Sequence, residues 1–173
     1  MSANVKGMMT EKAIFAASPK REYAMFGAGC FWGVEDALRQ VEGVLDVQVG
    51  YAGGHVDDPD YEVVCEGKTG HAEAVLIEFH PDIISYEELL EEFWDMHDPT
   101  TPNRQGPDVG DQYRSMIFYF GDEQKTKAES SKAARQEKHE DPIVTEITPA
   151  GDFWRAEEYH QRYLEKRRKM GIE

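Results

Sequence analysis

The chain has 173 residues, a length that suits one compact domain better than two. It contains 19 Lys and Arg residues against 34 Asp and Glu residues, and the formal charge of −15 argues against binding to nucleic acids or to anionic membrane surfaces. An aromatic content of 11% provides enough apolar bulk for a hydrophobic core, which argues against a disordered chain.

The sequence shows no sign of a membrane or secretory address. Its apolar runs stay below the roughly 18 to 20 residues that a membrane-spanning helix needs. Residues 13–17 are too short for the core of a signal peptide and follow two charged residues, so we expect a cytoplasmic protein. The two cysteines, Cys30 and Cys65, have neither zinc-ligand spacing nor the density of a disulfide framework, and we expect no metal site.

The predicted elements follow one another in a regular order. Residues 22–27 predict a strand that turns at Gly27-Ala28-Gly29 into a helix running from residue 30 to Gly43. Residues 44–51 and 71–79 predict strands, Ser85 and Glu88 predict a capping box that begins a second helix, and residues 115–120 predict a further strand. This order is that of a split βαβ unit. It predicts an α+β fold, a ferredoxin-like two-layer α/β sandwich.

The rest of the chain is expected to form a C-terminal extension. We predict a polar helix over residues 122–139, a strand over residues 143–148 and an amphipathic helix over residues 155–170. The basic cluster 166–169 is interpreted as a solvated helix end, where cations complement the helix dipole. Two long connections, 51–70 and 98–113, are expected to carry function because structureless loops of that length are uncommon in compact domains.

The two cysteines differ in their predicted surroundings. Cys30 falls at the first turn of a helix after glycines, where free backbone N–H groups stabilise a thiolate, so it is a candidate nucleophile. The alternative is that Cys30 is simply a small buried apolar residue. Cys65 precedes a polar loop and is interpreted as an inert or merely accessible thiol.

Aromatic and acidic residues near these positions suggest a site. Phe31 and Trp32 are adjacent at the start of a helix and cannot both point into one core, so at least one can line a cleft; plain core packing is equally compatible. Glu73 interrupts an apolar strand, where it is either a buried proton donor with a raised pKa or a solvent-facing side chain. Three residues of the long connections indicate no chemistry by themselves: Tyr61, Asp108 and Tyr113.

Many separate motifs follow one another between about residue 22 and residue 164. They are Gly29–Gly33 (GCFWG), Gly50–Gly54 (GYAGG), Tyr61–Cys65 (YEVVC), Thr69–Val75 (TGHAEAV), His97–Thr100 (HDPT), Gln105–Ser115 (QGPDVGDQYRS) and Ala156–Leu164 (AEEYHQRYL). In this order the motifs resemble those of the peptide methionine sulfoxide reductases of the A type. So many motifs in register are far more specific than any one short pattern.

The resemblance implies reduction of the S epimer of methionine sulfoxide, free or within proteins, and thus protein repair after oxidative damage. By this resemblance Cys30 attacks the sulfoxide sulfur and Glu73 protonates the departing oxygen. Tyr61 and Tyr113 would hydrogen-bond that oxygen, and Asp108 would organise the polar side of the site. The chemistry agrees, because a sulfoxide sulfur is a poor electrophile until its oxygen is protonated, so a thiolate needs a neutral acid opposite it.

The resemblance also implies an apolar subsite and a reductant. Phe31 and Trp32 would hold the ε-methyl group, with His160 and Tyr163 as supporting residues. Attack would leave Cys30 as a sulfenic acid that a thiol must reduce. Many family members carry resolving cysteines after the last motif, where this sequence has none. We therefore expect an external thiol, thioredoxin or glutathione with glutaredoxin, rather than Cys65, and no bound cofactor.

For the organisation of the molecule we expect a monomer, with a poorly ordered N-terminal extension over residues 1–20 and a single catalytic domain over residues 21–173. Three other functions remain open on the residues alone. They are a thiol peroxidase or peroxide sensor, a module that binds oxidised methionine without turnover, and a cysteine hydrolase that pairs Cys30 with His71, His97 or His160. An apolar methyl pocket would be useless for peroxide, and binding alone needs no nucleophile.

Overall fold

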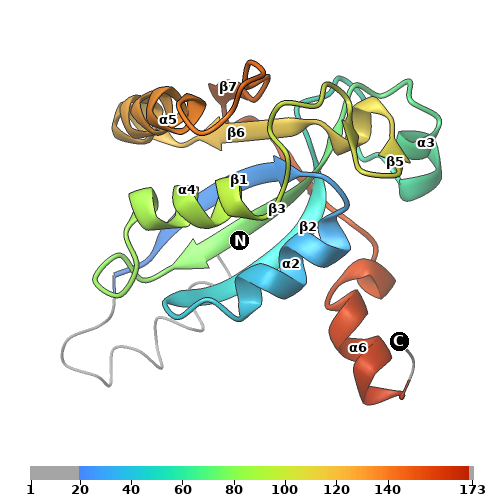
Figure 1. Cartoon of the computed structure of the whole chain (residues 1–173). Coiled ribbons are helices and arrows are strands. Elements are labelled where there is room, and N and C mark those ends of the chain that lie inside the picture. Colours follow the sequence, from blue (N-terminus) through green and yellow to red (C-terminus); the bar gives the residue numbers. More distant parts are fainter. Residues whose placement is uncertain (1–19, 172–173) are drawn as a thin grey trace, which may run out of the picture.

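The structure is a computed structural model that describes residues 20–171. Its centre is a curled six-stranded mixed sheet (Figure 1). The strands are β1 (Glu22–Ala28), β2 (Val44–Ala52), β3 (Ala72–Phe79), β6 (Ser115–Tyr119), β7 (Glu146–Pro149) and β8 (Phe153–Arg155). Their order in the sheet is β7-β6-β1-β3-β2-β8, so β1 and β3 lie in the middle.

The sheet confirms the predicted order of the first elements. Helix α2 (Phe31–Arg39) follows β1, and α4 (Tyr86–Asp95) follows β3. The four strands of this part, β6, β1, β3 and β2, pair antiparallel, whereas β7 runs parallel to β6 at the sheet edge. The described part of the chain therefore has an α+β fold.

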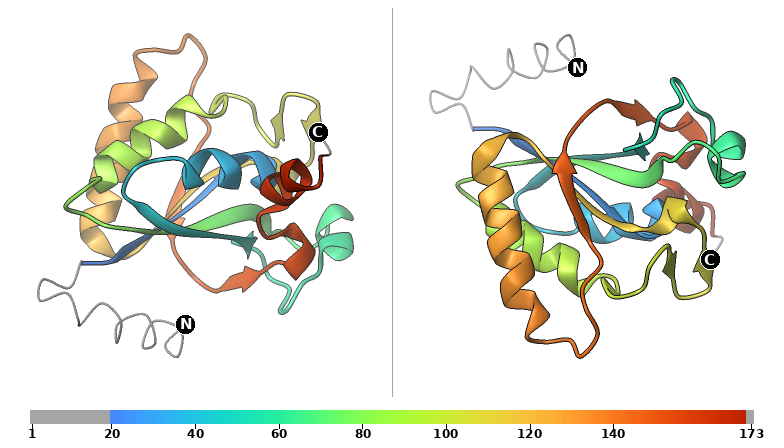
Figure 2. Two further views of the ribbon diagram at one scale, coloured as in Figure 1. Left: turned by 90° about the horizontal axis from the view of Figure 1, so that it is seen from below. Right: turned by 90° about the horizontal axis from the view of Figure 1, so that it is seen from above.

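The helices α2, α4 and α5 (Gly121–Gln136) cover one face of the sheet (Figure 2). Strand β3 shows why both faces are buried. Val75, Ile77 and Phe79 point into the main core beneath the helices, while Ala74 and Leu76 point into a smaller apolar cluster on the opposite face. Because successive side chains of a strand alternate between faces, an apolar run such as that of β3 indicates burial on both sides.

Helix α4 begins as its sequence predicts. The Ser85 hydroxyl accepts the backbone N–H of Glu88 at 3.0 Å, and the Glu88 carboxylate accepts the N–H of Ser85 at 2.9 Å. This capping box satisfies two of the N–H groups that the start of a helix leaves without partners.

The two long connections contain short elements. The first carries α3 (Tyr61–Cys65), whose start is capped by Asp60. The second carries a small hairpin of β4 (Arg104–Gln105) and β5 (Asp108–Val109), followed by a 3₁₀ turn over Asp111–Tyr113. Both connections thus present ordered backbone at the same end of the molecule (Figure 1).

The predicted extension is right in part. The helix expected over residues 122–139 is α5, and the strand expected over residues 143–148 is shorter and later, as β7. The helix expected over residues 155–170 is wrong. Residues 153–155 form β8, Glu158–His160 form a 3₁₀ turn, and only Tyr163–Lys169 form a helix, α6. Arg162 adopts the left-handed conformation at φ 56°, which interrupts any continuous helix.

Two expectations concern the ends of the chain and membranes. The predicted N-terminal extension over residues 1–20 lies almost wholly outside the described residues. Among the helices that the structure describes, none is long and apolar enough to cross a membrane.

Candidate active site

Cys30 lies at the N-cap of α2, directly after β1. Gly29 makes the turn possible, since its φ of 96° belongs to the region that favours glycine, and a Cβ there would lie only 2.9 Å from Cγ of Gln105. The thiol is half-buried and makes no cap hydrogen bond, but the backbone N–H groups of Trp32 and Gly33 act on it to lower its pKa. The predicted position of Cys30 at a helix start is therefore confirmed.

Glu73 comes from β3, the strand next to β1, and lies beside this helix start. Its side chain is 1% exposed, and Oε1 accepts the backbone N–H of Phe31 at 3.1 Å. Burial raises the pKa of Glu73 to about 8, the Phe31 N–H opposes that rise, and the negative charge of Asp108 adds to it. The buried alternative for Glu73 is thus the correct one, and the group holds a proton near neutral pH.

The predicted stabilisation of the Cys30 thiolate is wrong, because the pKa of Cys30 is raised rather than lowered. Burial raises the pKa of Cys30 to about 11; the negative charges of Glu73 and Asp108 add to this rise, whereas the N–H groups of Trp32 and Gly33 oppose it. The sequence reveals the helix N-terminus but not the desolvation that outweighs it. The negative charge of Glu73 therefore disfavours the Cys30 thiolate.

The three polar residues of the long connections surround this pair. Burial, followed by the charge of Glu73, raises the pKa of Tyr113 to about 12. Tyr61 is the first residue of α3; burial raises its pKa, and its hydroxyl contacts Cys65. Asp108, in β5, acts electrostatically on both Cys30 and Glu73. The structure thus brings together five groups that the sequence spreads over residues 30 to 113.

Aromatic rings form the other side of the site. The Trp32 ring stacks on Tyr163 with centroids 3.9 Å apart, and its Nε1 donates to Nδ1 of His160 at 2.9 Å. Phe31, by contrast, is fully buried against Tyr51 and His160, at centroid distances of 5.7 and 5.2 Å. Of the two rings, Trp32 is therefore partly exposed and Phe31 is buried.

His160 fixes the orientation of Trp32. It is 0% exposed, and burial lowers its pKa, so the ring is neutral at physiological pH. Because Nδ1 accepts the indole N–H, the remaining proton of the neutral ring belongs on Nε2, which lies 4.0 Å from a Glu157 oxygen. A neutral acceptor of this kind holds the indole without adding a charge to an apolar wall.

Sequence reasoning missed two residues that support this wall. The Tyr51 hydroxyl donates to Oε1 of Glu157 at 3.0 Å, and Oε2 of the same carboxylate accepts the Tyr61 N–H at 3.0 Å. Both residues lie in motifs that carry the family resemblance, which was the available signal. The sequence around Glu157, however, does not show whether its carboxylate bridges two other residues or is exposed to solvent.

Cys65 ends α3 and is exposed. Its thiol contacts the side chains of Tyr61 and Gln112, and burial of its surroundings raises its pKa. The expectation of an accessible thiol is confirmed, but Cys65 is also a neighbour of the polar side of the site.

The histidines considered as partners for a hydrolytic Cys30 are engaged elsewhere. His71 accepts the Gly54 N–H at 3.0 Å and contacts the Val56 carbonyl oxygen at 2.6 Å. His97 contacts the Phe93 carbonyl oxygen and the Ser115 hydroxyl, both at 2.7 Å. His160 accepts the Trp32 indole N–H at 2.9 Å, so none of the three histidines is hydrogen-bonded to Cys30, and the hydrolase alternative has no general base in place. Within residues 20–171 no group of His, Cys, Asp and Glu has the arrangement of a metal site.

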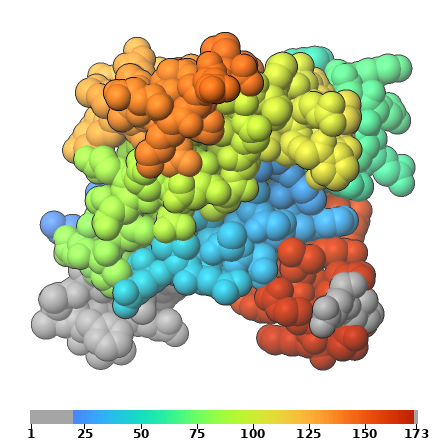
Figure 3. Space-filling model, in the orientation of Figure 1, coloured from blue at the N-terminus to red at the C-terminus, as the bar shows by residue number. Residues whose placement is uncertain are grey.

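The start of α2 lies at the surface, where it meets three other segments of the chain (Figure 3). In Figure 3 the blue N-terminal part of α2 reaches the surface between the yellow second connection above it and the red C-terminal segment below it, with the first connection alongside.

This combination of groups agrees with three comparisons with known proteins. The family model of peptide methionine sulfoxide reductase matches residues 22–173. A peptide methionine sulfoxide reductase MsrA of Methanothermobacter thermautotrophicus is 60% identical over 147 residues, which cover 84% of this chain and 87% of the relative. A peptide methionine sulfoxide reductase of Fragaria ananassa is 53% identical, with 86% of this chain and 78% of the relative covered.

Solved structures agree as well. The reduced form of Mxr1 from Saccharomyces cerevisiae superposes with a TM-score of 0.82 at 39% identity, covering 87% of each chain. Mxr1 in complex with Trx2 superposes with a TM-score of 0.61 at 29% identity, covering 83% of this chain and 85% of the other. The chain belongs to the peptide methionine sulfoxide reductase MsrA family, and its activity is the reduction of methionine sulfoxide.

Proposed function

We propose that this protein reduces the S epimer of methionine sulfoxide, free or in proteins, with Cys30 as nucleophile and Glu73 as acid. The observation that carries the proposal is the Glu73 carboxyl group, buried and bonded to the N–H of Phe31 at 3.1 Å, next to the N-cap cysteine. A pKa of about 8 keeps this carboxyl group protonated at neutral pH, so it can donate to the sulfoxide oxygen.

In the proposed reaction the Cys30 sulfur forms a bond to the sulfoxide sulfur as the Glu73 proton moves to the oxygen. The oxygen then passes to Cys30, which becomes a sulfenic acid, and methionine leaves with its sulfur reduced by two electrons. Because the pair shares its protons, the thiol proton of Cys30 replaces the one that Glu73 gives up. Tyr61 and Tyr113 hydrogen-bond the oxygen, and Asp108 organises the polar side of the site.

The substrate methyl group is proposed to lie against Trp32, with Phe31 beneath it. His160 and Tyr163 hold the Trp32 ring, through the 2.9 Å hydrogen bond and the 3.9 Å stack. This wall favours methionine sulfoxide over hydrogen peroxide, which has no apolar group to place there.

An external thiol is proposed to complete the cycle. One thiol displaces water from the sulfenic acid to give a mixed disulfide, and a second thiol releases Cys30. Thioredoxin is the favoured donor because a homologue of this chain has been crystallised with Trx2; glutathione with glutaredoxin is the alternative.

The finer description of the fold is also a proposal. The order β6-β1-β3-β2, with α2 and α4 on one face, supports a ferredoxin-like split βαβ core. We further propose that residues 21–173 act as one catalytic domain, since the late segment supplies His160 and Tyr163 to a site whose nucleophile lies at residue 30.

A single turnover tests the mechanism. The protein is mixed with an S-methionine sulfoxide peptide without reductant; methionine, remaining thiols and dimedone-trapped Cys30 are then quantified, with the R epimer and a Cys65→Ser variant as controls. We expect methionine with trapped Cys30 and Cys65 still free. Loss of both thiols would make Cys65 the resolving residue, and no methionine from folded, reduced protein would overturn the proposed reaction.

A further inference from the structure

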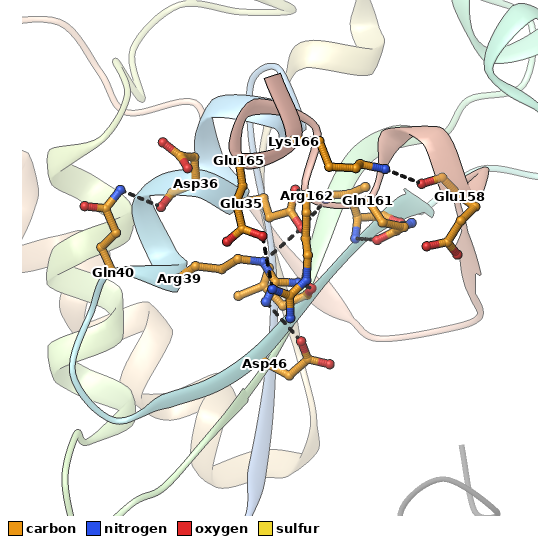
Figure 4. A network of polar contacts seen from close by, with 12 residues as sticks. Glu35, Asp36, Arg39, Gln40, Asp46, Glu158, Gln161, Arg162, Glu165 and Lys166 are labelled. Carbon is orange, nitrogen blue, oxygen red and sulfur yellow. Dashed lines mark hydrogen bonds and ion pairs between the residues drawn. The ribbon is translucent and has the colours of Figure 1, made fainter. Parts of the chain in front are cut away.

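Glu35 is a buried carboxylate that the proposed reaction does not use. It lies on α2 and is 1% exposed. Its two oxygens each lie 3.0 Å from the backbone nitrogen of Arg162, and Oε2 also accepts from Nε of Arg39 at 3.1 Å (Figure 4). The strongest connection of this side chain therefore leads from α2 to a residue far along the chain.

Burying a carboxylate costs free energy of desolvation, which its hydrogen bonds must offset. Burial raises the pKa of Glu35, while the Arg162 N–H, followed by the Arg39 guanidinium, favours the charged form. A leucine at this position of α2 would contribute apolar burial without any desolvation cost. The position of Glu35 is thus better explained by what it holds than by the stability of its own helix.

Glu35 holds a turn in an unfavourable backbone conformation. Arg162 has a φ of 56°, in the left-handed region that non-glycine residues seldom adopt. It directly precedes α6 and has no side-chain cap of its own there. The carboxylate accepts the N–H that this turn directs toward α2, and so fixes the turn where the late segment changes direction.

The two residues that hold Trp32 lie on either side of this turn. His160 precedes it and accepts the indole N–H at 2.9 Å, whereas Tyr163 follows it and stacks on the ring at 3.9 Å. Trp32 and Glu35 belong to the same helix, one turn apart. A bond from Glu35 to Arg162 therefore ties the ring and its two holders to one rigid element.

A second buried anchor of the late segment leads to a different element. The Gln161 side chain bonds to the N–H and the carbonyl of Val49 at 3.0 and 2.9 Å, which ties the segment to β2 rather than to α2. Of the Glu35–Arg162 and Gln161–Val49 contacts, it is the first that fixes the distance between the segment and the helix that carries Trp32.

We propose that Glu35 is a positioning residue for substrate binding: from the helix that carries Trp32 it fixes the Arg162 turn, and thereby the ring arrangement of the methyl pocket. This inference rests on the proposed role of Trp32. Glu35 touches neither Cys30 nor Glu73 in any contact described above, so the reactivity of the nucleophile is independent of it.

Three substitutions at Glu35 separate the effects of its hydrogen bond, its charge and the length of its side chain. Glu35→Gln keeps an oxygen that reaches the Arg162 N–H, Glu35→Asp keeps the charge but shortens the reach by one methylene, and Glu35→Leu removes both. Asp36→Asn is the matched control, because the neighbouring Asp36 also links α2 to α6, through Arg168 at 2.7 Å, but at the exposed surface.

The measurement is single-turnover reduction of a methionine sulfoxide peptide over a range of concentrations. We expect the half-saturating concentration to rise about tenfold in Glu35→Leu and less in Glu35→Asp, and to stay near that of the starting protein in Glu35→Gln and Asp36→Asn. The rate of Cys30 alkylation by iodoacetamide should be unchanged throughout. The Trp32 indole N–H resonance should move in the Leu and Asp variants only, a readout that needs no activity.

Unchanged half-saturation in both Glu35→Leu and Glu35→Asp would overturn the proposal, as would equal impairment of Glu35→Gln and Glu35→Leu. If Glu35→Leu does not fold, the contrast between Gln and Asp decides. Trp32→Leu separates this inference from the proposed function. If that variant binds the peptide normally, the methyl pocket itself is misplaced; if it binds weakly while the Glu35 variants bind normally, only the positioning role fails.

Discussion

Glu73 combines a chemical advantage with a cost in stability, and both arise from its burial. The carboxyl group is 1% exposed, and its pKa lies at about 8. A carboxyl group in water has a pKa near 4.3, so at neutral pH it has no proton to give. Burial on an inner strand raises the pKa of Glu73 against the opposing effect of the Phe31 N–H, and so suits this glutamate to its proposed role as the acid.

The first prediction concerns this acid. Glu73→Gln should retain part of the single-turnover rate, because an amide still donates a hydrogen bond to the oxygen, whereas Glu73→Ala should lose about 100-fold or more. The measurement is methionine formed per Cys30 in the absence of reductant, with thermal unfolding as the folding control. Equal losses in the two variants would show that Glu73 does not act by donating to the oxygen.

The second prediction concerns the cost. The folded pKa of Glu73 is raised above the unfolded value, so the folded state binds the extra proton and stability falls as pH rises from about 4.5 toward 8. The full effect of such a shift is on the order of 5 kcal/mol. Glu73→Gln should therefore be more stable than the starting protein at pH 8 and similar to it near pH 4. Urea titrations at both pH values measure this, and a variant that is less stable at pH 8 would contradict it.

At the scale of elements, the late segment shows where sequence patterns fail. Its periodicity predicts a helix over residues 155–170, but the Gln161 side chain takes the place of a strand partner against Val49, and Arg162 turns left-handed against Glu35. Both devices are long-range contacts of polar side chains, which periodicity does not register. The β1 and α4 boundaries were predictable because glycine conformations and capping boxes are local.

The third prediction tests the segment as an element. Gln161→Leu leaves the N–H and carbonyl of Val49 and the carbonyl of Ala156 without their side-chain partner. The expected destabilisation is about 2 to 4 kcal/mol, since buried backbone groups without partners are costly. The half-saturating peptide concentration should rise while Cys30 alkylation stays unchanged. Arg155→Ala, which removes an exposed ion pair to Glu158, is the control and should change neither quantity.

At the scale of the whole molecule, a half-buried histidine joins the helix layer to the sheet. His97, just after α4, contacts the Phe93 carbonyl and the Ser115 hydroxyl of β6, which in turn contacts the Thr145 hydroxyl at 2.7 Å. Burial lowers the pKa of His97 to about 4. The imidazole thus links the two layers, and its desolvation favours the neutral form over the protonated one.

The fourth prediction follows from that link. The folded pKa lies below the unfolded value of about 6.5, so the unfolded state takes up the proton first, and this contribution to stability is lost as pH falls from 6.5 to 4. The loss should amount to about 3 kcal/mol. His97→Gln should be less stable at pH 7 but lose less between pH 6.5 and 4, as measured by urea unfolding. Parallel pH profiles of the two proteins would refute this account.

The same scale shows how far the sequence leads. The order of strands and helices up to β6 follows from periodicity and turns, and the gathering of Cys30, Glu73 and Tyr61 was implied by motif resemblance. The sequence did not allow us to predict which groups are desolvated by their neighbours. The helix start predicted a lowered pKa for the Cys30 thiol, whereas burial raises that pKa to about 11. Desolvation depends on packing from several distant segments, so no single stretch of sequence contains it.

In the sheet order β7-β6-β1-β3-β2-β8, the proposed reacting groups and the residues that position Trp32 come from different places, the middle and the edge. The proposed nucleophile follows β1 and the proposed acid lies on β3, the two innermost strands. His160 and Tyr163, which contact Trp32, instead follow β8, an outermost strand. Elements at a sheet edge open locally at lower free energy than those at the centre. Mild heat or denaturant should therefore lower the selectivity for substrate before it lowers the reactivity of the Cys30 thiol. Under such conditions the thiol still reacts but no longer selects among substrates.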